Sequence, residues 1–274
     1  MTILQSIILG IVQGLTEFIP ISSSGHLVLV PYLFGWEIPS EDAFVFNILV
    51  QVATLTAVFA YFWTDIISIT RITFQDIRKK QPAAHPESRL AWFLVIATIP
   101  ASLIGLLFNG TFEKVFDSPA FVSIFLMVTA ALLVAAERMG KRARSLDTMN
   151  WIDAIWIGIF QILALFPGIS RSGVTITGGM TRDINRPDAA RFSFLMSIPI
   201  MVAAGLFAVV ELFQFPHFSD LLPTFIAGFI TAAITGYLSI RWLLKYLSHR
   251  SLYVFAIYCV AFGLLNLIVF LMRG

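Results

Sequence analysis

The chain has little charge and almost no cysteine. Only 12% of its 274 residues are charged, whereas 58% are hydrophobic. A soluble domain of this length needs more charge to cover its surface, so we expect the lipid bilayer to surround most of the chain. The single cysteine, Cys259, excludes an intramolecular disulfide and a cysteine-based metal site. The net charge of +2 gives no indication of nucleic-acid binding, and no nucleic-acid partner is expected.

Long uncharged stretches, by contrast, are frequent. A helix needs about 20 apolar residues to cross the hydrocarbon core, and six stretches reach or approach that length: 44–63, 91–108, 120–136, 192–210, 221–240 and 252–272. Two further apolar regions, 2–36 and 151–180, are interrupted midway by Pro, Gly and Ser. Because each half is too short to span, each region is predicted to form a re-entrant helix hairpin. The predicted fold is an all-α polytopic membrane domain, 1–274, with six transmembrane helices and two re-entrant hairpins.

This topology sorts the basic residues by side. If each hairpin returns to its side of entry, 15 of the 18 Lys and Arg fall on one face. The opposite face holds only Lys114 and Arg273, and Arg171 lies inside the second hairpin. Because basic residues mark the cytoplasmic side, both termini are predicted to lie outside. The residues of the basic face are Arg71, Arg78, Lys79, Lys80, Arg89, Arg138, Lys141, Arg142, Arg144, Arg182, Arg186, Arg191, Arg241, Lys245 and Arg250.

A segment of the first hairpin recurs 148 residues later. Residues 10–25 align with 158–173, and nine of the sixteen pairs are identical. The Gln, Ser and Gly identities are not explained by membrane composition. Each repeat, about 1–140 and 150–274, contains one hairpin and three spans. Because three spans take the chain to the other side of the membrane, the second repeat is inverted relative to the first. The two hairpin tips therefore enter from opposite sides and are expected to meet at mid-membrane.

Both hairpin turns carry residues suited to phosphate. Serines stand where the second half-helix of each hairpin should begin, and there they can cap the helix beside free backbone N–H groups that bind anions. Arg171 adds a planar guanidinium for bidentate contact with phosphate oxygens. Two half-helix N-termini with one arginine favour a multiply charged anion, such as a diphosphate.

Glu17 and His26 flank the first turn and are the acid/base candidates of this core. Gln13 and Glu17 are spaced i, i+4 and share a helix face, so their oxygens could hold Mg²⁺ or Ca²⁺. His26 can serve as a base, an acid or a nucleophile, and the nearby Ser23 could be activated to attack phosphorus. Phosphoryl transfer needs mainly positioning and charge neutralisation, which these residues supply.

Each of these groups also has a purely structural interpretation. Serines in membrane helices bond back to the preceding turn. Arg171 can be the counter-ion of Glu17, and His26 can be a packing donor between helices. Gln51 and Gln161 are interpreted as interhelical hydrogen-bonders. None of these interpretations explains why polar residues concentrate at both tips.

Three motifs resemble the undecaprenyl-diphosphate phosphatase family, the bacitracin-resistance proteins. They are Gln13-x-x-x-Glu17, Ser-Ser-Ser-Gly-His at 22–26 and Pro-Gly-Ile-Ser-Arg-Ser-Gly-Val-Thr at 167–175, and the resemblance covers nearly the whole chain. It implies inverted repeats with re-entrant hairpins. It also implies a hydrolase that removes the terminal phosphate of undecaprenyl diphosphate, recycling the lipid carrier of peptidoglycan synthesis. Divalent-metal dependence and a site open to the outer face of the bacterial inner membrane are further implications.

The resemblance also assigns roles to residues. Glu17, His26 and Arg171 form the implied catalytic core, and Ser23, His26 or water is the nucleophile. The metal ligands would be Gln13 and Glu17; many relatives carry Glu at position 13, so this site has one fewer formal charge. The implied diphosphate contacts are Ser22, Ser23, Ser24, Gly25, Ser170, Ser172, Gly173 and Thr175.

A transporter or flippase of a polyprenyl phosphate lipid is the alternative function. Inverted repeats with broken helices that meet at the midplane also characterise secondary transporters. Glu17 and His26 beside an anion site favour hydrolysis, because binding and release alone would not require them. The expected partners are a polyprenyl diphosphate substrate and membrane lipids, and the Gly and Ala residues on the spans would also permit a homodimer.

Overall fold

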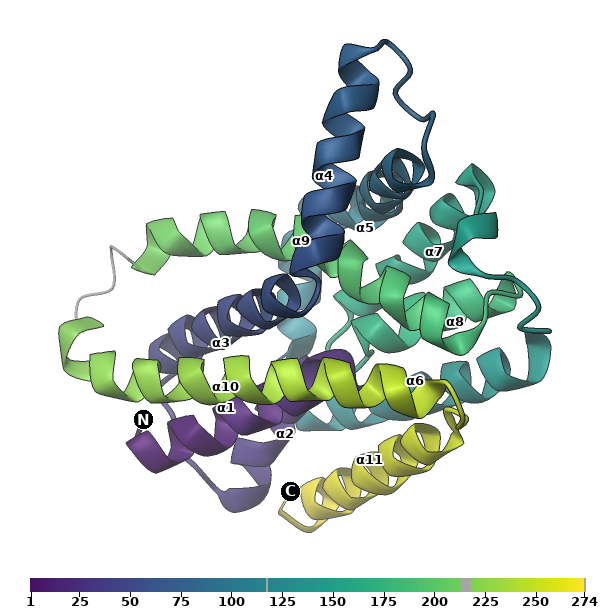
Figure 1. The fold of residues 1–274 in the computed structure, drawn as a ribbon. Coiled ribbons are helices and arrows are strands. Elements are labelled where there is room, and N and C mark those ends of the chain that lie inside the picture. Colours follow the sequence, from purple (N-terminus) through teal and green to yellow (C-terminus); the bar gives the residue numbers. More distant parts are fainter. Residues whose placement is uncertain (117, 213–217, 274) are drawn as a thin grey trace.

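The fold is helical throughout the residues that the structure describes (Figure 1). The structure is a computed structural model. It describes residues 1–116, 118–212 and 218–273, with side chains except at 109–116, 204, 206–212 and 218–220. No β-strand occurs within these ranges. The predicted all-α class is confirmed.

Five helices are long and apolar enough to cross a bilayer, and they match five of the six predicted spans. They are α3 (Ser40–Tyr61), α5 (Pro86–Phe116), α6 (Pro119–Met139), α10 (Phe218–Leu247) and α11 (Tyr253–Arg273). The predicted span 192–210 falls within α9 (Arg186–Leu212), where the side chains of 204 and 206–212 lie outside the described residues. The chain is therefore a polytopic membrane protein.

The two interrupted apolar regions each form a pair of short helices. The first pair is α1 (Ile3–Phe18) and α2 (Ser23–Phe34). The second is α7 (Trp151–Ile162) and α8 (Arg171–Thr181), with the 3₁₀ turns Leu146–Thr148 and Leu163–Leu165 before and after α7. Both breaks coincide with the predicted Pro and Ser clusters, because proline lacks the N–H that would continue a helix.

One helix was not predicted. No helix was expected in the segment 64–90, which connects the predicted spans 44–63 and 91–108, but the structure forms α4 (Trp63–Arg78), which begins at the last residue of the first span. Its apolar residues recur at helical spacing between charged ones, a pattern typical of a helix with one apolar face. A search for long uncharged stretches passes over such a helix.

Each helix hairpin packs against a helix from the other predicted repeat. Helix α1 packs along α10 of the second repeat, and α7 packs along α5 of the first. Glycines at equivalent repeat positions permit both approaches. A Cβ added to Gly10 would lie 2.5 Å from the Gly228 carbonyl oxygen, and one added to Gly158 would lie 2.6 Å from the Ala97 carbonyl oxygen. The same position of the repeat therefore makes the same kind of helix contact twice.

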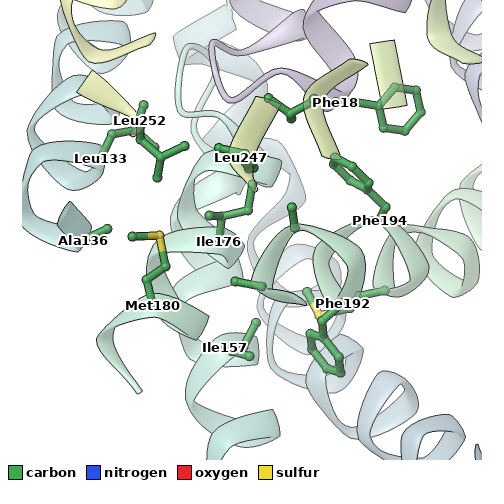
Figure 2. Close-up of a cluster of buried hydrophobic side chains, with 14 of the residues drawn as sticks. Phe18, Leu133, Ala136, Ile157, Ile176, Met180, Phe192, Phe194, Leu247 and Leu252 are labelled. Atoms are coloured by element: carbon green, nitrogen blue, oxygen red, sulfur yellow. The ribbon is translucent and has the colours of Figure 1, made fainter. Parts of the chain in front are cut away.

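Both hairpin turns are fixed to the apolar core. Every residue of α8 from Ser172 to Met180 is buried, and Figure 2 shows Ile176 and Met180 within a cluster that includes Leu133. At the end of α1, Phe18 packs edge-on against Phe194 of α9, with ring centroids 5.3 Å apart. This packing fixes the positions of the two turns relative to one another.

Buried carboxylates fasten loops of the basic face. Asp153 accepts hydrogen bonds from Arg144 at 2.6 Å and from Arg182 at 2.7 Å, and it is fully buried.

Of the two basic residues predicted on the opposite face, Arg273 donates to the Leu33 carbonyl oxygen at 3.0 Å. The side chain of Lys114 lies outside the described residues.

Candidate active site

The first tip lies between α1 and α2 and is organised by Ser22. The φ of this residue is +70°, a conformation that costs a non-glycine residue about 1–3 kcal/mol. Its hydroxyl oxygen accepts the N–H of Gly25 at 3.2 Å and so caps α2. The N–H groups of Ser23 and Ser24, in the first turn, have no intrahelical acceptor by helix geometry. This is the helix end that the sequence predicts to bind an anion.

Ser170 has the same role in the second tip. Its hydroxyl oxygen accepts the N–H of Gly173 at 3.1 Å. Gly168 in this turn has a φ of +94°, and a Cβ there would lie 2.3 Å from the Val122 carbonyl oxygen, so only glycine fits. Thr129 of α6 holds the turn, because it donates to the Gly168 carbonyl oxygen at 3.1 Å and accepts the Ser170 N–H at 3.0 Å. Nothing in the sequence around Thr129 predicted this role.

The two tips meet at Glu17. Its Oε1 lies 2.7 Å from Nη2 of Arg171, which forms an ion pair across the two repeats. Its Oε2 accepts the hydroxyl of Ser23 at 2.6 Å and the amide of Gln13 at 3.0 Å. Glu17 is 6% exposed, so these bonds are largely screened from bulk solvent, and charge interactions at such a site are stronger than in water. The predicted meeting of Glu17, Ser23 and Arg171 is present in the structure.

A cavity of about 210 Å³ opens beside this cluster. Its polar wall comes from both tips, and apolar side chains from α5, α9 and the second tip complete it. The lining residues are Glu17, Ser22, Ser23, Ser24, Gln51, Ala101, Gln161, Ala164, Leu165, Ile169, Ser170, Arg171 and Ile200.

Two buried polar atoms at this cavity have no partner among the described residues. They are Nη1 of Arg171 and Oε1 of Gln161. One end of the Arg171 fork is thus engaged by Glu17, while the buried Nη1 at the other end has no partner among the described residues. Gln51 and Gln161 were interpreted as interhelical hydrogen-bonders. Gln161 confirms this, because its Nε2 donates to the Ala97 carbonyl oxygen of α5 at 3.4 Å, and both glutamines also line the cavity. The signal for Gln161 was its repeat position, which is equivalent to that of Gln13.

His26 does not line the cavity. It is 3% exposed and faces α11, where its ring stacks on Phe262 with centroids 4.6 Å apart. Its Nδ1 lies 2.7 Å from the Ser22 carbonyl oxygen and its Nε2 lies 2.8 Å from the Tyr258 hydroxyl. The structure therefore places His26 behind the first tip, in contact with Ser22, rather than against the space where a phosphate would lie.

Four of the predicted diphosphate contacts support the tips rather than line the cavity. The N–H groups of Gly25 and Gly173 are engaged in the serine caps. Ser172 lies 3.1 Å from Ser170, hydroxyl to hydroxyl. Thr175 donates to the Arg171 carbonyl oxygen at 2.8 Å and lies 2.6 Å from the Ser193 hydroxyl. Ser22, Ser23, Ser24 and Ser170 line the cavity as predicted.

The predicted metal ligands have oxygen chemistry that suits a hard cation. Gln13 donates its amide nitrogen to Glu17, and its buried Oε1 has no partner among the described residues. Within that part of the chain, no group of three or more His, Cys, Asp or Glu forms a metal site. A hard divalent cation can nevertheless bind through one carboxylate, with substrate phosphates and water completing its shell. Glu17, which lines the cavity, fits that kind of site, whereas Gln13 contacts Glu17 from behind the cavity lining.

Comparison with known proteins gives consistent matches over the whole chain. Residues 6–265 match the family described as "Bacitracin resistance protein BacA". The chain is 42% identical to the undecaprenyl-diphosphatase of Methanosphaera stadtmanae, over 97% of each chain. It is 41% identical to that of Moorella thermoacetica over the full length of both. It is 43% identical to that of Chlorobium phaeobacteroides, over 96% of this chain and 95% of the relative.

Proposed function

Since the chain belongs to the bacitracin-resistance protein family, we propose that the cavity between its two tips is where it hydrolyses undecaprenyl diphosphate. The products are undecaprenyl phosphate and inorganic phosphate. The main support for this assignment is the position of Glu17. Its carboxylate bonds Arg171 of one tip and Ser23 of the other at the edge of one cavity. Transport alone would not require a carboxylate bonded to a serine hydroxyl.

The cavity supplies positive and hydrogen-bonding groups for a diphosphate. Nη1 of Arg171 is unengaged and can bind phosphate oxygens, while Glu17 holds the other end of the guanidinium in place. Ser24 and Ser170 add hydroxyls, and the first turns of α2 and α8 add N–H groups. Preorganised donors of this kind stabilise the charge that develops on transferring phosphoryl oxygens.

Ser23 is the proposed nucleophile. Its hydroxyl already donates to Glu17 at 2.6 Å, so the carboxylate can take the proton as the oxygen attacks the terminal phosphorus. The bond from that phosphorus to the bridging oxygen breaks, the bridging oxygen takes the proton from Glu17, and undecaprenyl phosphate leaves. Water then attacks the phosphorus of the phosphoserine and gives a proton to Glu17. Glu17 returns that proton to the Ser23 oxygen as the bond from this oxygen to phosphorus breaks and inorganic phosphate leaves. His26, which faces α11, takes no part in these transfers.

A divalent cation, Mg²⁺ or Ca²⁺, is proposed to bind at Gln13 and Glu17. Bound there, it would neutralise charge on the diphosphate. Glu17 would hold the cation by its carboxylate and Gln13 by its unpartnered Oε1. The neutral Gln13 leaves the ligand set with a single negative charge, so substrate oxygens are expected to complete it.

The membrane arrangement is part of the proposal. We infer six spans, two re-entrant hairpins and inverted repeats in the bacterial inner membrane, with both termini outside and the cavity open to the outer face. The equal caps at Ser22 and Ser170, together with the packing of α1 and α7 against helices of the other repeat, support the repeat. The homodimer stays a prediction.

Phosphate release from purified protein tests the activity directly. The full chain, given a polyprenyl diphosphate in detergent, should release phosphate with Mg²⁺ or Ca²⁺ present and much less with a chelator. An absence of release under every divalent cation would contradict hydrolysis. Unchanged release with the chelator would contradict only the cation site.

Phosphoryl trapping tests the nucleophile separately. With substrate labelled in its terminal phosphate, an acid quench during turnover should leave label on the peptide that contains Ser23. Ser23→Ala should lose the label and nearly all turnover, and Ser248→Ala, at an exposed serine outside the cavity, is the control that keeps the label. Substantial turnover by Ser23→Ala would exclude the covalent route and favour direct attack by water.

A further inference from the structure

Helix α4 presents an apolar stripe away from the protein. Trp63, Ile67, Phe74 and Ile77 follow helical spacing and are 58%, 47%, 62% and 48% exposed. At 100° per residue these four side chains fall within one narrow sector, which is far too regular for scattered surface residues. The stripe contacts nothing that would bury it within the described residues.

The opposite side of α4 is firmly packed, so the stripe does not result from a loosely placed helix. Ile66 and Ile69 pack against the main core cluster. Asp65 pairs with Arg191 of α9 at 2.6 Å. Asp76 is 1% exposed and accepts hydrogen bonds from the Ser88 hydroxyl at 2.6 Å and from the His85 ring at 2.7 Å. The body of the protein therefore fixes which face of α4 points outward.

The position of α4 identifies what the stripe faces. Helix α3, which is long and apolar enough to span a membrane, ends at Tyr61, and α4 begins two residues later at Trp63, so α4 starts at one end of this span. In Figure 1, α4 runs across the direction of α10 and away from the bundle. With 16 residues and four charged side chains it cannot span a bilayer itself. A helix that lies across the spans at their end lies in the plane of the membrane surface.

Charge on α4 specifies the kind of surface. Arg71 and Arg78 are exposed beside the apolar stripe, and no carboxylate among the described residues pairs with them. The two acidic residues of the helix, Asp65 and Asp76, are engaged on its inner side. An apolar face flanked by cations, with a tryptophan at its end, is typical of helices that lie in a lipid headgroup layer.

We propose that α4 is an interfacial helix whose stripe inserts into the bilayer on the basic face, where Arg71 and Arg78 bind the phosphates of anionic phospholipids. The helix thereby sets the depth of the bundle in the membrane. This inference does not depend on the hydrolase activity.

Depth measurements in nanodiscs test the proposal. A fluorophore is attached to a single introduced cysteine, either Phe74→Cys on the stripe or the adjacent exposed Gln75→Cys, since native Cys259 is buried. In discs that contain phosphatidylglycerol, the label at 74 should be quenched several-fold more by nitroxide lipids than the label at 75. Iodide in the water should give the opposite order.

A second experiment tests whether the insertion of α4 requires Arg71 and Arg78. Arg71→Gln with Arg78→Gln should reduce the lipid quenching at 74 in phosphatidylglycerol discs and change it little in phosphatidylcholine discs. Arg241→Gln with Lys245→Gln removes the same charge elsewhere on the basic face and is the control. Equal iodide quenching at 74 and 75 would overturn the proposal, because α4 would then lie in water. The proposal would also be overturned if the label at position 74 were protected from both quenchers and two copies of the protein could be cross-linked to each other. The stripe would then be buried against a second copy of the chain.

Discussion

At the scale of single residues, Glu17 decides what its neighbours can do. It accepts hydrogen bonds from Arg171, Ser23 and Gln13, which leaves one arm of Arg171 for an anion and gives Ser23 a proton acceptor. Burial makes each of these bonds stronger than it would be in water and makes an unpaired partner costly. Substitutions at Glu17 would therefore disturb three residues at once, and its neighbours are better tests of individual roles.

Arg171→Lys tests the two-armed role of the guanidinium. Lysine carries a single compact ammonium and cannot bind Glu17 and a phosphate in the same planar geometry. We expect kcat/KM for phosphate release to fall about 100- to 1,000-fold, which corresponds to roughly 3–4 kcal/mol of lost transition-state stabilisation. Arg182→Lys, at the C-cap of the same helix but paired with Asp153, is the matched control. A loss of less than threefold for Arg171→Lys would remove Arg171 from phosphate binding.

His26 contacts the Ser22 backbone and does not line the cavity, so we interpret it as a positioning residue. A carbonyl oxygen only accepts hydrogen bonds, so the contact between Nδ1 and the Ser22 carbonyl places the ring hydrogen on Nδ1. In the neutral ring Nε2 then accepts the Tyr258 hydroxyl. His26 thus holds Ser22 in its unfavourable positive-φ conformation, and α2 keeps its cap.

Asparagine and glutamine at position 26 separate this role from acid/base chemistry. The asparagine amide nitrogen reaches roughly the place of Nδ1, whereas that of glutamine reaches the place of Nε2. We expect His26→Asn to keep most of the turnover and His26→Gln and His26→Ala to lose about tenfold, the worth of one buried hydrogen bond. The measurement is kcat and KM for phosphate release by monodisperse protein. If His26→Asn were as inactive as His26→Ala, an acid, base or nucleophile role would be restored to the histidine.

At the scale of helices, the sequence predicted the parts of the site that local chemistry determines. Serine at a helix start and proline in a turn have short-range consequences, so the breaks and the caps at Ser22 and Ser170 could be predicted. The side toward which His26 points depends on how α2 rotates against Tyr258 of α11, more than 200 residues away. Whether Gln51 and Gln161 face the cavity likewise depends on how their helices pack against distant ones. No local sequence pattern distinguishes them from packing residues.

Gly158→Ala tests whether close helix packing positions the second tip. The added methyl would lie 2.6 Å from the Ala97 carbonyl oxygen, and α7 would have to move away from α5. Gly105→Ala on α5 meets nothing closer than 3.4 Å and is the control. Both substitutions gain about 1 kcal/mol of helix propensity, so their difference reports the clash.

We expect Gly158→Ala to lower the free energy of unfolding by about 1–3 kcal/mol relative to Gly105→Ala. A denaturant titration of each protein in the same detergent measures this difference in the free energy of unfolding. Equal stabilities would show that α7 and α5 can separate without cost.

At the scale of the whole molecule, hydrophobic length and basic-residue counts predicted the class of the protein and most of its spans. They missed α4, because a helix that lies on a membrane surface alternates apolar and charged residues and never produces a long uncharged stretch. They also could not show that each hairpin packs against a helix from the other repeat, since the packing of α1 on α10 joins segments more than 200 residues apart. Repeat symmetry indicates that two halves are alike but not which half each hairpin contacts.

The orientation of the bundle is the remaining large-scale prediction, and α3 allows a direct test. Its 22 residues cover about 33 Å at 1.5 Å per residue, enough to cross the hydrocarbon core. Exposed Glu37 before it and exposed Gln81 beyond α4 must then lie on opposite sides. Because the basic residues gather on the Gln81 side, that side is expected to be cytoplasmic.

A membrane-impermeant maleimide on intact cells should therefore label Glu37→Cys and not Gln81→Cys. After lysis both should react, while the unmodified chain stays unlabelled because Cys259 is buried. The reverse order would turn the bundle over and place the cavity's access on the cytoplasmic side. Labelling of both positions in intact cells would mean that the chain inserts in two orientations. In that case the excess of basic residues would not fix the orientation of this fold.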